Sequence, residues 1–230
     1  MTDHTVRAFD RELELLGRRI ADMGGIAEKM LSESIEALMR LDVDGAKAII
    51  ATDIRLDILQ REVEEEAVRI IARRQPVSID LREIVGTMRI SGDLERVGDL
   101  AKNIAKRTVA LATDQRLPRA MIGLRHMGEL AAIQLKDVLD AYGQRDVERA
   151  DAVWRRDAEI DALEDSVFRD LLTFMMEDPR NISSCTHLLF CSKNVERAGD
   201  HATNIAETVH YIVTGETLPV DRPKSMFGRH

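Results

Sequence analysis

An eleven-residue string that is rich in carboxylate and amide side chains occurs twice in the chain. It runs from Glu95 to Ala105 and returns from Glu196 to Ala206, with eight of the eleven positions identical at a constant offset of 101. Both copies keep Glu, Asp and Asn at every fourth position, a spacing that sets oxygen ligands at successive turns of a helix. Oxygen-only sets suit hard or borderline cations, so the string predicts metal binding rather than packing.

Two further acidic pairs precede the two strings and correspond to each other at an offset of 104. Counted from the proline that marks the turn of each helix pair, these acids lie at about the same height as the Glu and Asp of the string that follows. The sequence therefore predicts one set of level carboxylates in each half. The candidate metal ligands are Asp53, Asp57, Glu95, Asp99 and Asn103 in the first half, and Asp157, Asp161, Glu196, Asp200 and Asn204 in the second.

Four level carboxylates repel one another unless cations bridge them or some are protonated. The ions expected at such a site are Fe, Zn, Mn or Mg. Two other interpretations stay open. The acids can be solvated or paired with neighbours such as Arg96, which makes the protein a metal-free structural scaffold, or the metals can activate water or oxygen in a multi-metal enzyme. The sequence shows no general base, and its one Glu-x-x-His motif, at Glu207 and His210, has no counterpart in the first half, so no catalytic residue is predicted.

Six long helices must position these side chains, because apolar residues recur at steps of three and four along most of the chain. The helices are expected at about 9–41, 46–73, 80–113, 118–142 and 147–177, with a sixth that ends near Gly215. Short connections imply antiparallel neighbours. We therefore predict an all-α fold of two tandem, duplicated three-helix bundles, at 5–114 and 115–215, and an extended tail at 216–230. Gly98 and Gly199, inside the repeated strings, predict the close approach of a helix or a ligand.

The composition narrows the class of protein. A formal net charge of −8 disfavours a general nucleic-acid binder, which needs a basic face. No apolar run approaches the roughly 20 residues of a membrane span, and the N-terminus carries no secretory signal. Cys185 and Cys191 stand where the first half has Ile84 and Ile90, so we expect them to be buried as small hydrophobic residues. These features favour a cytoplasmic protein.

The chain resembles the PhoU family of regulators of bacterial phosphate uptake over about residues 5–215. The resemblance is carried by Arg74-Gln75-Pro76-Val77 with Asp80-Leu81-Arg82, and by the two Glu-Arg-x-Gly-Asp-x-Ala-x-Asn-Ile-Ala strings. The second half departs from the first in one loop, where Asp178-Pro179-Arg180-Asn181 replaces the Arg-Gln-Pro sequence.

The resemblance implies two three-helix bundles with metal ions on the acidic motifs and a non-enzymatic role, the repression of the phosphate-starvation response when phosphate is plentiful. It also implies that the protein bridges the ATPase subunit of the phosphate ABC transporter and a phosphate-sensing histidine kinase. Peripheral membrane association would come through these partners, and a homodimer is expected. No residue of the chain identifies the partners by itself.

Overall fold

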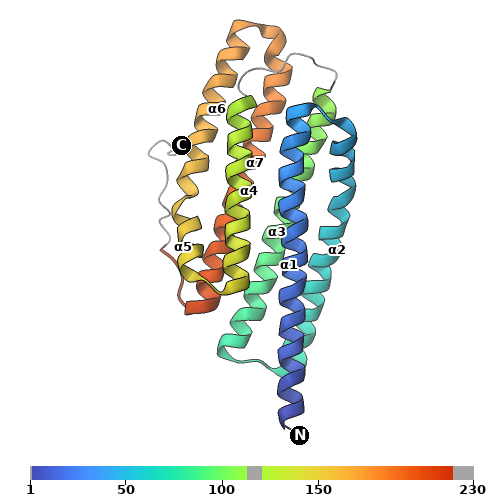
Figure 1. The fold of residues 1–230 in the computed structure, drawn as a ribbon, viewed down its shortest axis with the longest axis vertical. Helices are drawn as coiled ribbons and strands as arrows, with labels where there is room; N and C mark the ends of the chain where they lie inside the picture. The colour runs from blue at the N-terminus through green and yellow to red at the C-terminus, as the bar shows by residue number, and fades with distance from the viewer. Residues whose placement is uncertain (1, 113–120, 220–230) are drawn as a thin grey trace.

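The computed structural model describes residues 2–112 and 121–219, with the backbone alone for residues 2–7. Within them the chain forms helices and no strand (Figure 1). The elements are α1 (Thr2–Arg40), α2 (Val43–Arg74), α3 (Ser78–Leu111), α4 (Met121–Gln144), α5 (Val147–Arg155), α6 (Asp157–Glu177), the 3-10 turn η1 (Pro179–Asn181) and α7 (Ile182–Thr214). The predicted all-α fold is confirmed.

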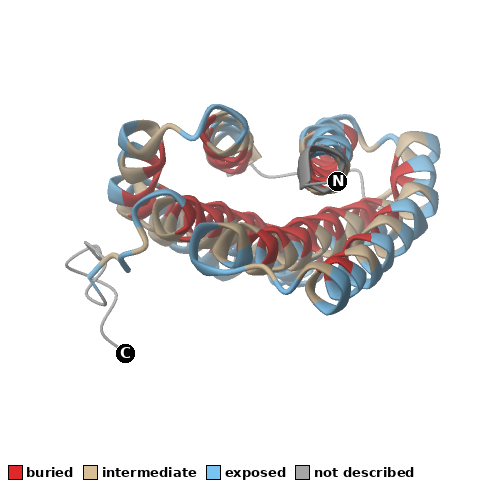
Figure 2. Cartoon of the chain, turned by 90° about the horizontal axis from the view of Figure 1, so that it is seen from below, coloured by how far each residue is buried: buried red, intermediate tan, exposed pale blue. Residues whose placement is uncertain are grey.

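The helices form two bundles that share one hydrophobic core. Helices α1, α2 and α3 pack together, as do α4, α5, α6 and α7, and the two bundles contact each other through α3 with α7 and α1 with α4. Figure 2 shows the buried residues on the faces that the helices turn toward one another. The junction between the predicted halves falls within 113–120, outside the described residues, so the boundary at 114 stays a prediction, as does the tail beyond 219.

The fifth predicted helix is broken, and the prediction of one continuous helix over 147–177 was wrong at this point. At Arg156 the backbone leaves the helical region, with φ −91° and ψ 3°. The side-chain amide of Gln134 donates to the carbonyl oxygen of Arg156 over 3.2 Å, so this carbonyl takes a partner from α4. A new helix, α6, then begins at the buried Asp157, where a carboxylate in the first turn is favoured by the helix dipole.

Two glycines of the repeated strings allow neighbouring helices to approach closely. A Cβ atom added to Gly98 would overlap Leu56 of α2, and one added to Gly199 would lie 2.6 Å from Cδ1 of Ile160 in α6. The predicted close approach is therefore confirmed, and the approaching group is a helix in both halves. These contacts draw α2 onto α3 and α6 onto α7, which brings the acidic residues of each helix pair together.

Helices α3 and α7 run antiparallel across the interface between the bundles. Asp93 contacts His201 over 2.8 Å, and Nη1 of Arg107 lies 3.4 Å from Nδ1 of His187. A step of fourteen residues forward along α3 thus corresponds to fourteen residues backward along α7. The helices that carry the two repeated strings consequently pack against each other in opposite directions, and the strings meet only at their first turns.

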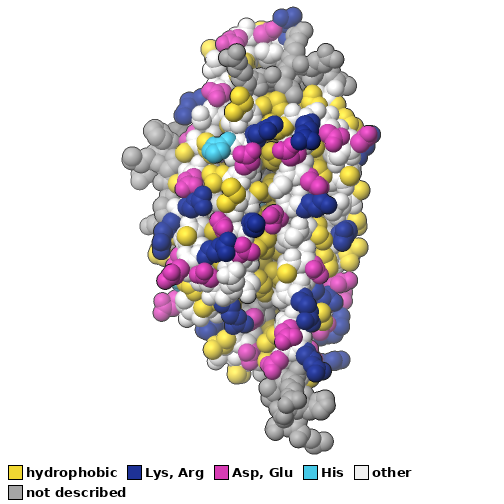
Figure 3. Space-filling model, viewed as in Figure 1, with side chains coloured by type: hydrophobic (Ala, Val, Ile, Leu, Met, Phe, Trp, Pro, Cys, Tyr) yellow, Lys and Arg dark blue, Asp and Glu magenta, His cyan; other side chains and the backbone are white. Residues whose placement is uncertain are grey.

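A groove of about 820 Å³ separates α1 from α4 on the face shown in Figure 3, where hydrophobic side chains follow its length. Its floor includes Val209 and Ile212 of α7. No helix of the described residues is long and apolar enough to span a membrane. Cys185 and Cys191 are both buried, as predicted, and burial raises the pKa of the Cys191 thiol to about 12.

Candidate metal centre

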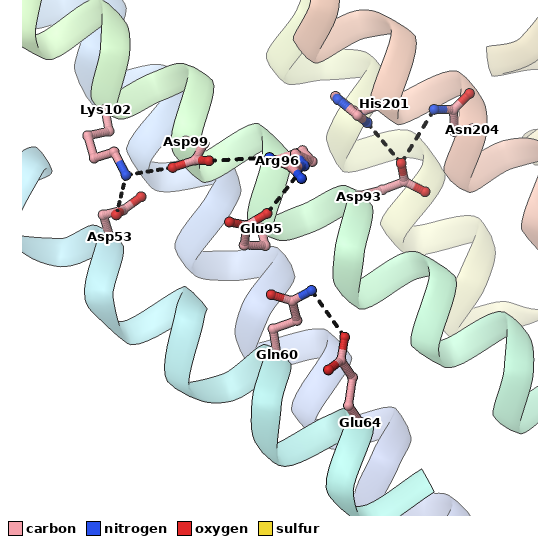
Figure 4. A network of polar contacts seen from close by, with 10 residues as sticks. All are labelled: Asp53, Gln60, Glu64, Asp93, Glu95, Arg96, Asp99, Lys102, His201 and Asn204. Carbon is pink, nitrogen blue, oxygen red and sulfur yellow. Dashed lines mark hydrogen bonds and ion pairs between the residues drawn. The ribbon is translucent and has the colours of Figure 1, made fainter. Parts of the chain in front are cut away.

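The first acidic cluster consists of Asp53 and Asp57 on α2 with Glu95 and Asp99 on α3. An ammonium group lies inside this cluster: Nζ of Lys102 donates to Oδ2 of Asp53 over 2.6 Å and to Oδ1 of Asp99 over 2.5 Å (Figure 4). Partial burial lowers the pKa of Lys102, but these two hydrogen bonds outweigh it and hold the pKa above its ordinary value. The first cluster therefore contains its own cation.

Burial and the other three carboxylates of the first cluster all raise the pKa of Glu95. Its pKa is raised, first by burial and then by the negative charge of Asp99, with smaller contributions from Asp57 and Asp53. Arg96 lies at the edge of the cluster, 3.7 Å from both Glu95 and Asp99, which is the arginine pairing considered in the metal-free interpretation. The four acids thus lie within electrostatic reach of one another, and two basic side chains accompany them.

The second acidic cluster consists of Asp157 and Asp161 on α6 with Glu196 and Asp200 on α7. Thr203 stands at the position that corresponds to Lys102, and its hydroxyl donates to Oδ1 of Asp157 over 2.9 Å. A neutral donor therefore replaces the internal ammonium group of the first cluster.

The basic residue of the second cluster is Lys193, which stands where the first half has Gly92. Its Nζ donates to Oε1 of Glu196 over 2.9 Å. The other oxygen of this carboxylate, Oε2, is buried and accepts no hydrogen bond from any described residue. A buried oxygen of this kind is costly unless something binds it.

Ionisation of the second cluster is opposed by its surroundings. The pKa of Asp161 is raised, first by burial and then by the charges of Asp157 and Glu196. The pKa of the neighbouring Glu164 is also raised, mainly by burial and by Glu196, although Lys193 acts against this. A bound cation would favour the charged forms of these groups and would give Glu196 Oε2 a partner.

The two clusters fit a metal ion to different degrees. As the side chains stand, the part of the chain that the structure describes contains no group of three or more His, Cys, Asp or Glu positioned to hold one ion. In the first cluster, the ammonium group of Lys102 takes the position between Asp53 and Asp99. The second cluster offers the better donor set, because Glu196 keeps an unpartnered buried oxygen beside two further acids. Metal binding stays a prediction for both clusters.

The two predicted amide ligands lie at the interface between α3 and α7. Nδ2 of Asn204 is 3.4 Å from Oδ1 of Asp93, which also contacts His201 (Figure 4). Asn103 lines a separate pocket at the same interface. The reason is geometric: each four-residue step on a helix advances about 40° around the axis, so the Asn lies about 80° from the Glu eight residues earlier.

The single Glu-x-x-His motif is tied to α5. Glu207 accepts a hydrogen bond from Nε1 of Trp154 over 3.1 Å, and His210 contacts Asp151 over 2.8 Å. Both residues therefore join α7 to α5. Sequence reasoning missed Lys102 and Lys193. A signal was present, because the two halves differ at these positions: Thr203 corresponds to Lys102, and Gly92 corresponds to Lys193.

Comparisons with known proteins agree over nearly the whole chain. The family model described as the PhoU domain matches twice, at residues 20–108 and 124–209. The phosphate-specific transport system accessory protein PhoU homolog of Rhizobium meliloti is 54% identical over 222 residues, which is 96% of this chain and 93% of that protein. The protein of the same name from Caulobacter vibrioides is 50% identical over 97% of both chains.

Solved structures give the same result. The crystal structure of PhoU from Pseudomonas aeruginosa superposes with a TM-score of 0.88 at 37% identity and covers 90% of this chain and all of that one. The crystal structure of the phosphate transport system regulatory protein PhoU from Streptococcus pneumoniae gives a TM-score of 0.85 at 29% identity, with 92% of this chain covered.

Proposed function

The chain belongs to the PhoU family, and we propose that it is an accessory protein of phosphate-specific transport that regulates phosphate uptake. The observation that carries this proposal is the 54% identity to an accessory protein of that system, over nearly the full length of both chains. A regulatory role, rather than a catalytic one, is in keeping with relatives that are named as accessory or regulatory proteins.

The proposal extends to partners. In this view the protein links the ATPase subunit of the phosphate ABC transporter to a phosphate-sensing histidine kinase, and it represses the phosphate-starvation response while phosphate is plentiful. It works in the cytoplasm as a homodimer and reaches the membrane through the transporter. The same family membership supports these features.

The second acidic cluster is the metal site in this proposal. An ion of Mg, Mn, Fe or Zn would be held by Asp161, Glu196 and their neighbours Asp157 and Asp200. The support is the buried unpartnered oxygen of Glu196 and the raised pKa of Asp161. A metal there would neutralise the cluster and fasten α6 to α7, so that partners meet a rigid surface. In the first cluster the ammonium group of Lys102 pairs with Asp53 and Asp99, and it thereby neutralises the acids and fastens α2 to α3.

The test is retention of the two partners by the purified full chain. Immobilised protein is incubated with the transporter ATPase subunit and with the cytoplasmic part of the kinase, with and without a chelator. We expect both partners to be retained by the metal-loaded protein. Retention of neither partner would overturn the adaptor role.

A pair of variants separates the metal from the adaptor role. Asp161→Asn with Glu196→Gln removes two charges from the second cluster, and we expect it to abolish metal binding and weaken partner retention. Glu33→Gln with Glu36→Gln removes the same charge from two exposed positions of α1 and serves as the control. If the first pair binds partners as the control does, the metal has no part in partner binding, whereas the adaptor role stands.

A further inference from the structure

A basic pocket of about 390 Å³ lies between α3 and α7, near the C-terminal end of α3. It is lined by Asn103, Lys106, Arg107 and Ala110 of α3 and by His187 and Asn194 of α7. No carboxylate is among these residues of the described chain. The lining is thus basic although the formal net charge of the protein is −8.

Arg107 is held in place but is not saturated with acceptors. Its guanidinium carbon lies 4.0 Å from the centroid of the Phe190 ring, a stacking contact that fixes the plane of the group. One nitrogen, Nη1, lies 3.4 Å from His187, while Nε is buried and has no hydrogen-bond partner among the described residues. The guanidinium group therefore keeps donor capacity that the described residues do not use.

The donors around this pocket match a tetrahedral oxyanion. An arginine fork donates to two oxygens at once, a lysine adds a second positive charge, and the side-chain amides of Asn103 and Asn194 add neutral donors. We propose that this pocket binds a phosphoryl dianion, either free inorganic phosphate or a phosphoryl group carried by a larger molecule. This proposal does not rest on the adaptor function or on metal binding, and its failure would leave both standing.

The fold itself does not impose this basic character, because the repeat builds a related pocket at the other end of the α3–α7 interface. That pocket has a volume of about 500 Å³ and includes three carboxylates, from Asp93, Glu95 and Glu207. At the offset of 101, Glu207 replaces Lys106 and Thr208 replaces Arg107. The same backbone arrangement therefore carries an oxyanion-type donor set at one end and a mixed set rich in acid at the other.

The experiment is isothermal titration of the full chain with inorganic phosphate, in chloride buffer at fixed ionic strength, after removal of metal so that no ion in the acidic clusters binds phosphate. Three single variants are compared: Lys106→Ala, Arg107→Gln, and Arg89→Ala as the control. Arg89 lines the related pocket, and its loss removes the same charge from the same helix. Lys106 is exposed, so its variant is expected to keep the wild-type melting temperature even if Arg107→Gln does not.

We expect the wild type and Arg89→Ala to bind phosphate alike, and Lys106→Ala and Arg107→Gln each to bind it about tenfold more weakly, as the loss of a charge-assisted hydrogen bond predicts. No measurable binding to the wild type, or equal weakening by Lys106→Ala and Arg89→Ala, would overturn the assignment. A parallel titration with phosphoserine identifies the source. Binding of phosphate alone indicates the free ion, and binding of both indicates an attached phosphoryl group.

Discussion

The two acidic clusters are built on the same helix-pair geometry but neutralise their charge in different ways. In the first, the ammonium group of Lys102 lies between Asp53 and Asp99. In the second, Thr203 supplies only a hydroxyl at that position, and the pKa of Asp161 is raised by burial and by its acidic neighbours. The chain therefore supplies a cation between the two helices of the first cluster, whereas the second has a neutral hydroxyl at that position, and we propose that a bound cation completes it.

This difference shows which parts of a duplicated unit are held by packing and which are free to change. The glycine contact between the paired helices is present in both halves, with Leu56 against Gly98 and Ile160 against Gly199. The positive charge at the centre of the cluster, by contrast, is present only in the first half, where Lys102 corresponds to Thr203 of the second. The carboxylates alone consequently do not define a metal site, because the residue opposite them decides whether there is a place for an ion.

Replacing the internal cation should have the largest effect. Lys102→Thr gives the first cluster the residue of the second, and we expect it to lower the free energy of unfolding by about 3 kcal/mol, since acids that are partly buried lose their partner. The measurement is urea unfolding in metal-free buffer, and added Mn²⁺ should restore part of the loss. Lys106→Thr, at an exposed position, is the control. Equal stability of the two variants would show that Lys102 does not neutralise the cluster.

Enlarging the two conserved contacts should test whether the halves share their packing. Gly98→Ala and Gly199→Ala each place a methyl group against a buried side chain of the partner helix, and we expect each to cost about 2 kcal/mol. Gly25→Ala is the control, because nothing lies within 4 Å of the added group and helix propensity alone should stabilise the protein. Thermal unfolding provides the measurement. A large effect in only one half would mean that the two helix pairs are not packed equivalently.

Supplying a cation to the second cluster should remove the need for a metal. Thr203→Lys introduces the ammonium group that the first cluster has, and we expect Mn²⁺ affinity to fall by about tenfold, or 1.4 kcal/mol. Titration calorimetry measures this. Thr173→Lys adds the same charge at an exposed site on α6 and should leave the affinity unchanged. Unaltered binding in Thr203→Lys would place the ion elsewhere.

The smallest expected effect concerns pH. Because the pKa of Asp161 is raised in the fold, the protonated form is favoured there, and the metal-free protein loses stability as pH rises through that folded pKa. Asp161→Asn removes this loss, so we expect a gain of about 0.5 kcal/mol at neutral pH that disappears below the ordinary pKa of 3.8. Unfolding measured across this pH range gives the result. A variant that is less stable than wild type at neutral pH would contradict the proposed repulsion.

The sequence was sufficient for the fold and for bringing the acids together, because both depend on helical periodicity and on a repeat that keeps its spacing. It was not sufficient for the break at Arg156, which depends on a hydrogen bond from Gln134 on another helix. The placement of Asn103 and Asn204 at the interface between α3 and α7 could have been anticipated, since each lies about 80° around the helix from the Glu eight residues earlier. The role of Lys102 was visible in principle, but only by reading where the two halves differ.

The antiparallel packing of α3 against α7 has a consequence for how the halves have diverged. Two separate copies of one three-helix unit that met in this way would form an isologous pair, in which every residue has the same surroundings twice. Joining the copies in a single polypeptide lifts that requirement of symmetry. Asp93 and Asn194 are no longer obliged to be the same residue, and neither are Glu207 and Lys106. The pocket at one end of the interface thereby includes three carboxylates and the pocket at the other end includes none, an asymmetry that a pair of identical subunits cannot adopt.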